Sequence, residues 1–487
     1  MGKSFRLYDT LTKHVKPLEP TEPGHLRFYT CGPTVYSYSH IGNFRSFITS
    51  DLVVRTAKAI GWKVTWVSNI TDVGHLTQDD VADAAGEDKM EKALRSKEGE
   101  SFHNVWELAE YYTETYREDW DRLNLTEPDI RPKATQHVRG QILAAEELIR
   151  KGFAYETPTG VYYNVESFPE YGKLSGNTQD KLREGTRDVV QDENKRAQAD
   201  FAVWKKDDKH LMQWFSPYGW GFPGWHIECS VMAREYLGDT IDLHSGGEDN
   251  IFPHHECEIA QSEALTDKPF SKHWLHTRFL LVDGEKMSKS KGNFYTVRDL
   301  IGRGFDPIAL RWALMSGVYN KQLNFTLQGV HDAEANIGRL RRARAVAHAA
   351  TGEGENHLGT ILAGVYEEAL DAMLNDLNTS VALAKALEGA KTIVRDEPLN
   401  AAAGKSALEF IDKIEALLGV VGPEVKEIAE KVQTADDARI QALVDERTAA
   451  KKAKDFARAD ALRQQLESEG IELRDSPEGT VWVAKRA

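Results

Sequence analysis

The sequence is poor in cysteine, in long apolar runs and in positive charge. Only three of its 487 residues are cysteines, Cys31, Cys229 and Cys257, and an odd set this small cannot build a disulfide framework. Such thiols suit metal binding or chemistry, and their odd number argues against an extracellular protein. No window approaches 18 consecutive apolar residues and no apolar segment follows the first residues, so we expect neither a membrane span nor a secretory signal. The expected location is cytoplasmic.

The net charge of -15 argues against indiscriminate nucleic-acid binding, because phosphate contacts need lysine and arginine. It leaves room for a basic face confined to one part of the chain. The length, with 41% hydrophobic residues, is enough for roughly three domains with sizeable cores. Composition therefore favours a multidomain enzyme.

One stretch has the layout of a strand, a glycine-containing turn and a helix start. Residues 26–30 have the composition of a strand, and apolar residues recur at helical spacing from Phe44 onward. A helix N-terminus at the carboxyl end of a parallel strand favours an anion such as a nucleotide phosphate. His40 could donate a hydrogen bond to that phosphate. In the alternative, the His-x-Gly sequence only ends the strand and His40 is solvated.

Other predicted strands also end in polar or glycine-rich segments. Residues 63–67 lead into Asn69-Ile-Thr-Asp72, and residues 240–244 lead into a turn at 245–249 where glycines let a nucleotide approach the backbone. We interpret the sheet as interrupted after residue 130 and resumed near Gly224–Cys229. Such strands, with helices between them, predict a Rossmann-like fold with its ligand at the strand ends.

The segment from Phe252 to Glu258 predicts a helix start, because proline suits the first helical turn. His254 and Glu258 would then lie on one face at i and i+4, a spacing found in metal sites. His255 and Cys257 would point about 100° to either side, outside that site. A solvated His–Glu pair at the same spacing is the alternative.

A lysine-containing loop follows the strand predicted at 279–283. Lys286, Lys289 and Lys291 alternate with small residues between Gly284 and Gly292. A mobile loop that clamps a triphosphate is one interpretation, and an exposed charged turn is the other.

Six motifs belong together in this chain. They are Cys31-Gly-Pro-Thr-Val-Tyr36, His40-Ile-Gly-Asn43, Asn69-Ile-Thr-Asp72, Gly224-Trp-His-Ile-Glu-Cys229, Phe252-Pro-His-His-Glu256 and Lys286-Met-Ser-Lys-Ser290. Their combination resembles cysteinyl-tRNA synthetase, a class I aminoacyl-tRNA synthetase. The resemblance spans nearly the whole chain, with departures at Asn43, where class I enzymes usually have histidine, and at Glu248, where the family commonly has serine.

The resemblance implies an α/β fold, with a Rossmann-like class I catalytic core, an inserted α+β module, an α-helical bundle and a small C-terminal domain. The implied domains are the first half of the Rossmann domain at 1–130, the inserted connective module at 131–220, the second Rossmann half at 221–275, the linker fold with the Lys286–Ser290 motif at 276–328, the bundle that binds the tRNA stem at 329–430, and the anticodon-recognition domain at 431–487.

The resemblance also implies a site. One Zn²⁺ per chain would select the thiolate of L-cysteine, and ATP with Mg²⁺ would activate it for transfer to tRNA(Cys). Trp225 could instead be a core aromatic. The implied residues are Cys31, Cys229, His254 and Glu258 for the metal; His40, Lys286 and Lys289 for catalysis; His40, Gly42, Asn43, Gly246, Asp249 and Lys289 for ATP; and Thr71 and Trp225 for cysteine. A monomer without membrane contact is expected.

Two other functions belong to different classes. A ligase joining cysteine to an amino sugar would use the same adenylate chemistry, but the 57 residues after Glu430 count against it. A non-catalytic tRNA-binding protein would be expected to lack metal ligands or phosphate-binding lysines, and the sequence keeps both.

Overall fold

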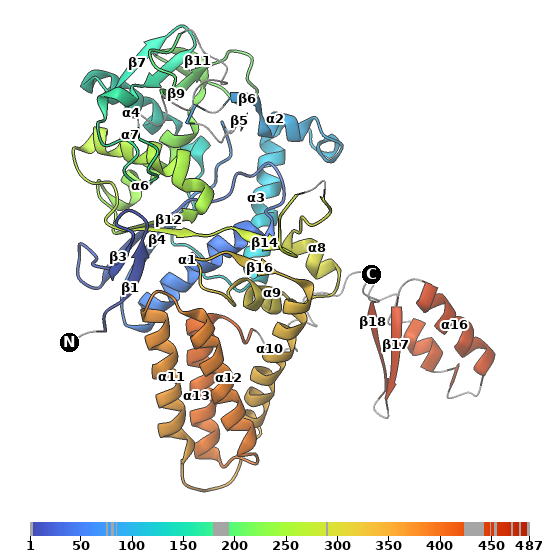
Figure 1. The fold of residues 1–487 in the computed structure, drawn as a ribbon. Helices are drawn as coiled ribbons and strands as arrows, with labels where there is room; N and C mark the ends of the chain where they lie inside the picture. The colour runs from blue at the N-terminus through green and yellow to red at the C-terminus, as the bar shows by residue number, and fades with distance from the viewer. Residues whose placement is uncertain are drawn as a thin grey trace. The chain divides into compact units, whose positions relative to one another are not determined.

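The computed structural model describes residues 3–74, 76–78, 82–83, 85–178, 194–288, 291–422, 443–448, 450–451, 455–468, 471–476 and 479–484. Contacts divide the chain into two compact units, each described here by itself. The first is Met1–Val297 with Pro307–Val420, and the second is Arg298–Asp306 with Val421–Ala487. Figure 1 shows the first unit as a mixed α/β body with a helical bundle. None of the described helices is long and apolar enough to cross a membrane.

A parallel sheet lies at the centre of the first unit. Its described strands follow the order β13-β12-β3-β4, and every neighbouring pair is parallel. Such a sheet is buried on both faces, and most residues of these strands are accordingly buried although several are polar. The strands are β3 (His25–Thr30), β4 (Lys63–Ser68), β12 (Leu243–Gly247) and β13 (Trp274–Thr277).

Helix α1 (Ile41–Ala59) follows β3 and begins with a capping box. The His40 side chain accepts a hydrogen bond from the Asn43 N–H, and the Asn43 side chain accepts one from the His40 N–H, each at 3.1 Å. The two side chains satisfy two of the four N–H groups that a helix start leaves unpaired. This reciprocal cap holds His40 at the carboxyl end of the sheet.

Three further helices pack around the sheet. They are α3 (Val105–Arg122), α6 (Trp225–Leu237) and α7 (Glu256–Thr266). Tyr116 and Trp120 of α3 pack against the Phe47 ring of α1 in edge-on and tilted arrangements, with centroids 5.4 and 5.7 Å away. Helix α6 packs on α7, so two elements that carry cysteine and histidine side chains lie side by side.

The segment between the sheet halves forms an antiparallel sheet of its own, covered by α4 (Val138–Lys151). Its strands are β7 (Ala154–Thr157), β8 (Gly160–Tyr163), β9 (Phe201–Lys206), β10 (Trp214–Ser216) and β11 (Gly219–Pro223). A second insertion forms the hairpin of β5 (Leu76–Gln78) and β6 (Ala85–Asp88), followed by α2 (Lys89–Leu94). Helix α2 packs against α3.

A small sheet connects the core to the bundle. It consists of β14 (Leu280–Val282), β15 (Glu285–Lys286) and β16 (Leu323–Phe325), followed by α10 (Leu327–His348). The buried Arg45 side chain of α1 donates to four carbonyl oxygens near this sheet, those of Arg278, Phe279, Val318 and Lys321. These bonds fix the path of the chain just before β14.

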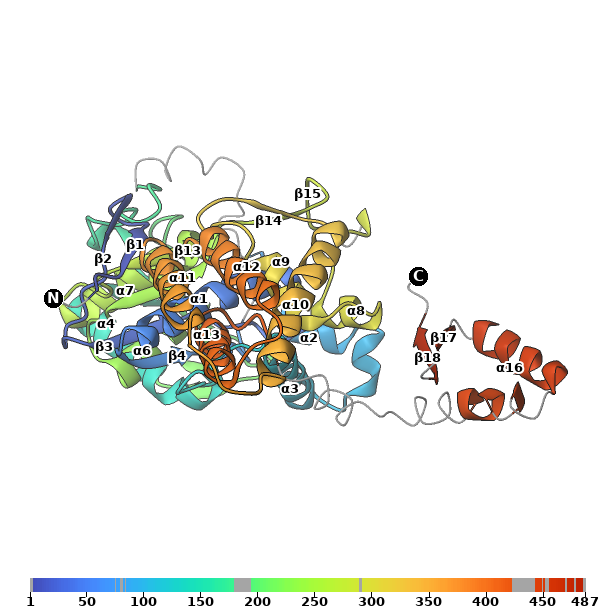
Figure 2. The ribbon, with the colours of Figure 1, turned by 90° about the horizontal axis from the view of Figure 1, so that it is seen from below.

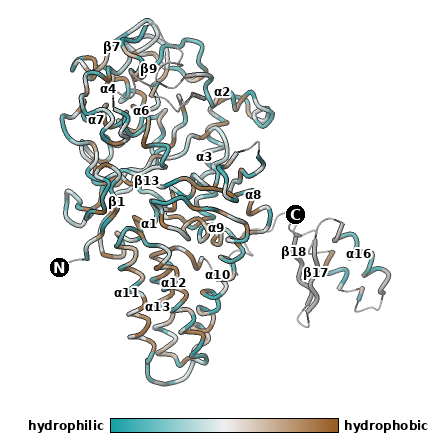
Figure 3. Tube along the Cα trace, viewed as in Figure 1, coloured by the Kyte–Doolittle hydropathy of each residue, from teal (hydrophilic) through white to brown (hydrophobic). Residues whose placement is uncertain are grey.

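The bundle packs α10 against α11 (Leu358–Leu374), α12 (Thr379–Arg395) and α13 (Ala401–Leu418). The four helices lie side by side in Figure 2, and apolar and polar residues alternate along them in Figure 3, as amphipathic packing requires. Arg311 of α9 (Pro307–Leu314) joins the bundle to the core. Its guanidinium donates to the Leu418 carbonyl at 2.8 Å and to the Asp51 carboxylate of α1.

The second unit contains α8 (Val297–Gly302) and, in its C-terminal part, α16 (Phe456–Ser468) beside the hairpin of β17 (Ile471–Ser476) and β18 (Gly479–Ala484). Most of the residues between Val421 and Phe456 lie outside the described part. The prediction of an α/β fold with a parallel sheet and a helical region after it is confirmed.

Two local predictions were wrong. Gly224–Cys229 is not the return of the sheet but the start of helix α6, whose apolar residues are buried on most sides and so carry no amphipathic pattern. Strand β12 extends to Gly247, so the predicted turn at 245–249 begins later, as a 3₁₀ turn at Glu248–Asn250.

Candidate active site

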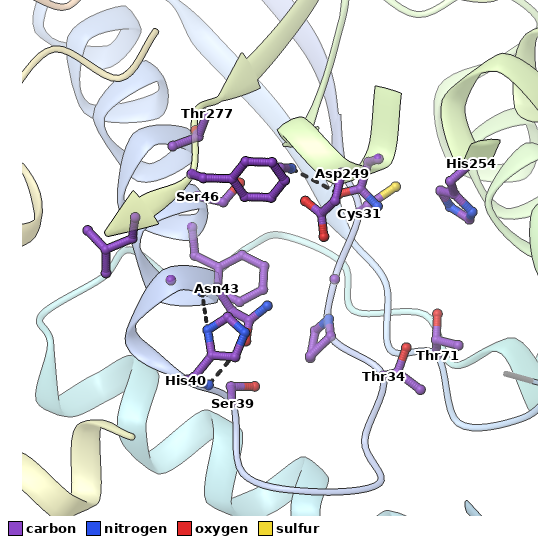
Figure 4. A pocket seen from close by; sticks show the side chains of 18 of the residues that line it. Cys31, Thr34, Ser39, His40, Asn43, Ser46, Thr71, Asp249, His254 and Thr277 are labelled. Carbon is purple, nitrogen blue, oxygen red and sulfur yellow. Dashed lines mark hydrogen bonds between the residues drawn. The ribbon is translucent and has the colours of Figure 1, made fainter. Parts of the chain in front are cut away.

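A cavity of about 690 Å³ lies at the carboxyl ends of β3, β12 and β13. Figure 4 shows His40 and Asn43 together at the start of α1, Asp249 and Thr277 apart from them, and His254 beyond Cys31. The predicted site residues that line the cavity are Cys31, His40, Gly42, Asn43, Thr71, Trp225, Cys229, Asp249, His254 and Lys286. Open parallel sheets bind ligands at this edge.

Four buried side chains meet at one end of the cavity. One ligand atom from each of Cys31, Cys229, His254 and Glu258 lies within 4.8 Å of the other three. Cys31 comes from the end of β3, Cys229 from the first turns of α6, and the His–Glu pair from the start of α7. The two Sγ atoms are 3.9 Å apart, and His254 Nε2 is 2.9 Å from Glu258 Oε1. Two sulfurs, one nitrogen and one oxygen form a donor set suited to tetrahedral zinc.

Charge is concentrated in this cluster. Burial alone would raise the pKa of Glu258, but His244 and His254 lower it to about 2. Burial alone would lower the pKa of His254, but Glu258 and Cys229 raise it to about 10. The pKa of Cys229 falls to about 6 despite burial, because Cys31 and His254 donate toward its sulfur. Without a metal the cluster thus holds a thiolate at Cys229 and a carboxylate at Glu258 beside a protonated His254, and burial raises the pKa of the Cys31 thiol. Binding of a metal by all four side chains requires that His254 and Cys31 lose these protons.

A second set of four shares two of these residues. Cys31, His244, His255 and Glu258 also lie within 4.8 Å of one another, and His255 Nε2 is 3.2 Å from Cys31 Sγ. His255 therefore contacts Cys31, but it is absent from the set that holds His254, and the expectation that it lies outside that site stays a prediction. Neither His244 nor His255 lines the cavity, whereas Cys31, Cys229 and His254 do. Only the first set can present an ion to a substrate there.

Cys257 belongs to neither set of described residues. It is buried, and its Sγ lies 3.3 Å from the Tyr171 hydroxyl. The backbone of Phe252 is extended, with φ -142° and ψ 133°, and helical geometry follows it. The helical register expected from Pro253 thus accounts for the position of Cys257.

The phosphate-binding candidates lie at the start of α1. The Nδ1 atom of His40 accepts the Asn43 N–H, so a neutral imidazole carries its proton on Nε2 and can donate it. Asn43 Oδ1 is engaged in the same cap. A Cβ atom at Gly42 would lie 2.8 Å from Met287 Cε and 3.0 Å from the His40 ring, so a side chain there would displace the end of Met287 and crowd the imidazole.

The amino-acid candidates, Trp225 and Thr71, line the same cavity as Cys31, Cys229 and His254. The Trp225 ring lies 4.3 Å from the His254 ring, centroid to centroid, and both line the cavity. Thr71 is buried and its hydroxyl accepts from the Asn69 side chain at 3.1 Å. Asn69 in turn accepts from the Gly32 N–H at 2.9 Å, which fixes the turn after Cys31.

The remaining predicted residues have different positions. Gly246 does not line the cavity; a Cβ atom there would lie 2.8 Å from both Asn250 Oδ1 and His255 Cε1, so packing requires glycine. Lys286 lines the cavity with its Nζ 5.6 Å from the Phe279 ring centroid. Lys289 lies outside the described residues.

Lys89, Arg278 and Phe279 are among the lining residues that were not predicted. Lys89 begins α2, and its Nζ lies 5.5 Å from the Tyr36 ring centroid, which brings a cation to the cavity. Arg278 and Phe279 follow β13 directly. The sequence offers one signal that Lys89 lines the cavity, which is its position after the Asn69-Ile-Thr-Asp72 motif.

Comparison with known proteins identifies the family. Residues 17–335 match the family of class I (C) tRNA synthetase catalytic domains. The chain is 53% identical to the cysteine–tRNA ligase of Salinibacter ruber, over 98% of both chains. It is 41% identical to that of Chlorobaculum tepidum, over 99% of this chain and all of the other. The chain belongs to the cysteine–tRNA ligase family. The resemblance seen in the sequence is thereby confirmed.

The fold of this family member is shared more widely. Mycobacterium tuberculosis methionyl-tRNA synthetase, solved in complex with methionyl-adenylate, matches 82% of this chain and 92% of its own with a TM-score of 0.58. The sequence identity is 13%, so this likeness concerns the class I fold alone.

Proposed function

We propose that the protein activates L-cysteine with ATP to cysteinyl-adenylate and transfers the cysteinyl group to the 3′ end of tRNA(Cys). The observation that carries this proposal is a cluster of two thiols, an imidazole and a carboxylate at the end of a cavity whose other wall is a capped helix start. The relatives named above are cysteine–tRNA ligases. They give no support to a cysteine–amino-sugar ligase.

Cys31, Cys229, His254 and Glu258 would hold one Zn²⁺ per chain. When bound there, zinc would take the substrate thiol as a thiolate and so favour cysteine over serine. His226 supports this assignment, because its Nδ1 lies 3.1 Å from His254 Nδ1 and its Nε2 lies 2.8 Å from the Ala82 carbonyl. Partners of this kind orient a ligating imidazole. Trp225 and Thr71 would enclose the amino acid beside the metal.

The chain itself needs no nucleophile for activation. The cysteine carboxylate would attack the α-phosphorus of ATP and pyrophosphate would leave, so the protein's task is positioning and charge stabilisation. The His40 Nε2–H and the N-terminus of α1, with Gly42 and Asn43, would contact the phosphates. Lys286 and Lys289 would stabilise the charge that develops on pyrophosphate, together with Mg²⁺.

Transfer requires that the tRNA be held far from the cavity. The bundle, whose helix α10 carries Arg339, Arg341, Arg342 and Arg344, would contact the tRNA stem, and residues 431–487 would recognise the anticodon. The domain bounds 1–130, 131–220, 221–275, 276–328, 329–430 and 431–487 are part of this proposal. We expect a cytoplasmic monomer.

The deciding experiment measures cysteine-dependent ATP–pyrophosphate exchange without tRNA, and then charging of tRNA(Cys). We expect both activities, with exchange at least a hundredfold weaker for serine. Exchange with no charging, and ligation to a sugar amine instead, would replace the proposal by the ligase alternative. No exchange by a zinc-loaded protein would refute cysteine activation.

A further inference from the structure

One contact near the metal cluster comes from the hairpin of β5 and β6. The carbonyl oxygen of Ala82, which lies between these two strands, is 2.8 Å from His226 Nε2. Ala82 is 8% exposed and His226 is 2% exposed, so both partners are buried. A carbonyl oxygen can only accept a hydrogen bond, so His226 carries a proton on Nε2. The hairpin thus determines which nitrogen of His226 is the donor.

The other nitrogen of His226 faces the metal-ligand candidate His254, and their Nδ1 atoms are 3.1 Å apart. A charged His226 would be a buried cation directly beside an imidazole that binds a metal cation. Because that arrangement is unfavourable, we take His226 as neutral. A neutral ring with its proton on Nε2 has a lone pair on Nδ1, so it accepts the Nδ1–H of His254.

This direction of the hydrogen bond leaves the other nitrogen of His254 for the metal. Nε2 of His254 lies 2.9 Å from Oε1 of Glu258, a member of the same ligand set. When His254 gives up one proton to bind a metal, the proton that His226 accepts stays on Nδ1, and the lone pair forms on Nε2. The contact with His226 therefore selects the metal-binding form of His254.

The carboxylate of Asp83 fastens the hairpin to the inserted module that contains the antiparallel sheet. Its Oδ2 accepts from Lys195 Nζ at 3.1 Å, and its Oδ1 lies 3.3 Å from Lys205 Nζ and 3.3 Å from the Ala202 nitrogen. Lys205 and Ala202 belong to β9, which Figure 1 shows close to β5 and β6. Donors from one module thus hold the residue that directly follows Ala82.

Lys195 is itself held in one position. Its side chain is 4% exposed, and its Nζ also donates to the carbonyl oxygens of Gln198 and Asp200, at 3.1 and 3.0 Å. An ammonium ion has three N–H groups, and these three acceptors match them. A buried cation that is fully hydrogen-bonded gives Asp83 a fixed partner.

We propose that the β5–β6 hairpin retains the metal through a hydrogen-bond relay, in which the Ala82 carbonyl holds His226 and His226 keeps a proton of His254 on Nδ1. Asp83 positions the carbonyl. His226 and Asp83 belong neither to the metal-ligand sets nor to the cavity lining, so they are positioning residues. This inference rests on the proposed zinc site and assigns the residues that maintain it from the inserted module.

The test measures the dissociation constant of Zn²⁺ for the full chain by competition with a chelator. His226→Leu removes both hydrogen bonds and should raise this constant about 10- to 100-fold, the usual effect of losing a partner of a ligating histidine. His226→Gln keeps one donor and one acceptor in its amide group and should stay within about threefold of the wild type. A loss in the first variant and a rescue in the second distinguish hydrogen bonding from packing.

Asp83→Ala tests the hairpin. It should raise the zinc dissociation constant about fivefold, and it should have no further effect in the His226→Leu background, because both residues act through one relay. Glu263→Ala is the matched control. Glu263 is 15% exposed against 14% for Asp83, pairs with Lys173 at 2.6 Å and accepts the Phe270 N–H at 3.2 Å, but the relay does not include it. This control should leave the zinc dissociation constant unchanged.

The outcomes separate this inference from the proposed function. A wild-type protein that binds zinc but shows no cysteine-dependent exchange would refute the proposed function and leave the relay in place, and one that binds no zinc would refute both. Equal zinc affinity of the wild type and His226→Leu would overturn the relay alone. Equal weakening in His226→Gln and His226→Leu would replace hydrogen bonding by packing. Additive effects of Asp83→Ala and His226→Leu would overturn the role of the hairpin. If His226→Leu fails to fold, the comparison of Asp83→Ala with Glu263→Ala decides, and equal zinc affinities would overturn the proposal.

Discussion

Removing the guanidinium of Arg311 tests how the catalytic core is joined to the bundle. This side chain is completely buried and bonds to Asp51 of α1, to the carbonyls of Leu123 and Asn124, and to Leu418 at the end of α13. Arg311→Met fills similar volume but removes the donor of the Leu123 and Leu418 carbonyls, whereas the Asn124 carbonyl still accepts from Arg55. Breaking a buried ion pair by removing one partner costs about 3 to 5 kcal/mol.

Asp51 keeps one other cationic partner, which limits the loss of stability. Arg55 Nε donates to its carboxylate at 2.8 Å, so that group is not left unpaired. We therefore expect Arg311→Met to lower the free energy of unfolding by about 4 kcal/mol. Urea unfolding followed by tryptophan fluorescence should show this as a midpoint about 1 M lower, at a slope of about 4 kcal/mol per M for a unit of this size. Arg150→Met is the control, since Arg150 forms an exposed pair with Glu147 and should not shift the midpoint.

The same network gives a pH dependence. Burial alone would raise the pKa of Asp51, but Arg55 and Arg311 lower it to about 2. Burial also lowers the pKa of Arg311, but a guanidinium stays protonated throughout this range, so Asp51 alone titrates. Its stabilisation is therefore complete above pH ~4, its unfolded pKa, and is lost as the pH falls toward 2.

Asp51→Asn should remove that part of the pH dependence. Equal urea midpoints for Arg311→Met and Arg150→Met would refute the reasoning. They would mean that the buried pair of Arg311 and Asp51 makes no net contribution to the free energy of unfolding.

Other predictions concern the site. The isolated protein should contain about one zinc per chain. Cys229→Ser should lower the zinc content and the discrimination against serine, whereas Cys257→Ser should change neither, as metal analysis and exchange with both amino acids would show. Loss of zinc in Cys257→Ser would mean that the helical register expected from Pro253 is wrong. Lys286→Ala should lower the kcat of exchange about a hundredfold with little change in the KM for cysteine. A rise in the KM for cysteine alone would contradict the proposed contact of Lys286 with pyrophosphate. A folded protein ending near Val432 should keep exchange but lose most tRNA charging, with a smaller salt dependence of tRNA binding; undiminished charging would remove the anticodon role from the tail.

The sequence was most informative where local chemistry decides the structure. The strand at His25–Thr30 and the helix after it follow from β-branched and aromatic residues, then helical spacing, and both lie where they were predicted. It was misleading at Trp225–Leu237, because a helix buried on most sides has no periodic pattern and resembles a buried strand.

Contacts between distant positions could not be predicted from local patterns. Arg311 and Asp51 are separated by 260 residues, and no spacing rule links a buried arginine to one aspartate among many. The same holds for Glu248 and Arg278, which meet only because β12 and β13 are neighbours in the sheet. The contact between His255 and Cys31 has a similar cause, since the two residues are 224 positions apart in the sequence.

Side-chain hydrogen bonds fix helix α1 at several turns along its length, and they limit which parts of the site can move. Arg45 fixes its second turn to four carbonyls, and Asp51 and Arg55 fix its later turns to α9 and α13. A rotation or a slide of α1 would break all of these bonds together. Closure around a substrate must therefore come from the walls that face α1, and amide hydrogens in the middle of this helix should exchange among the slowest in the chain.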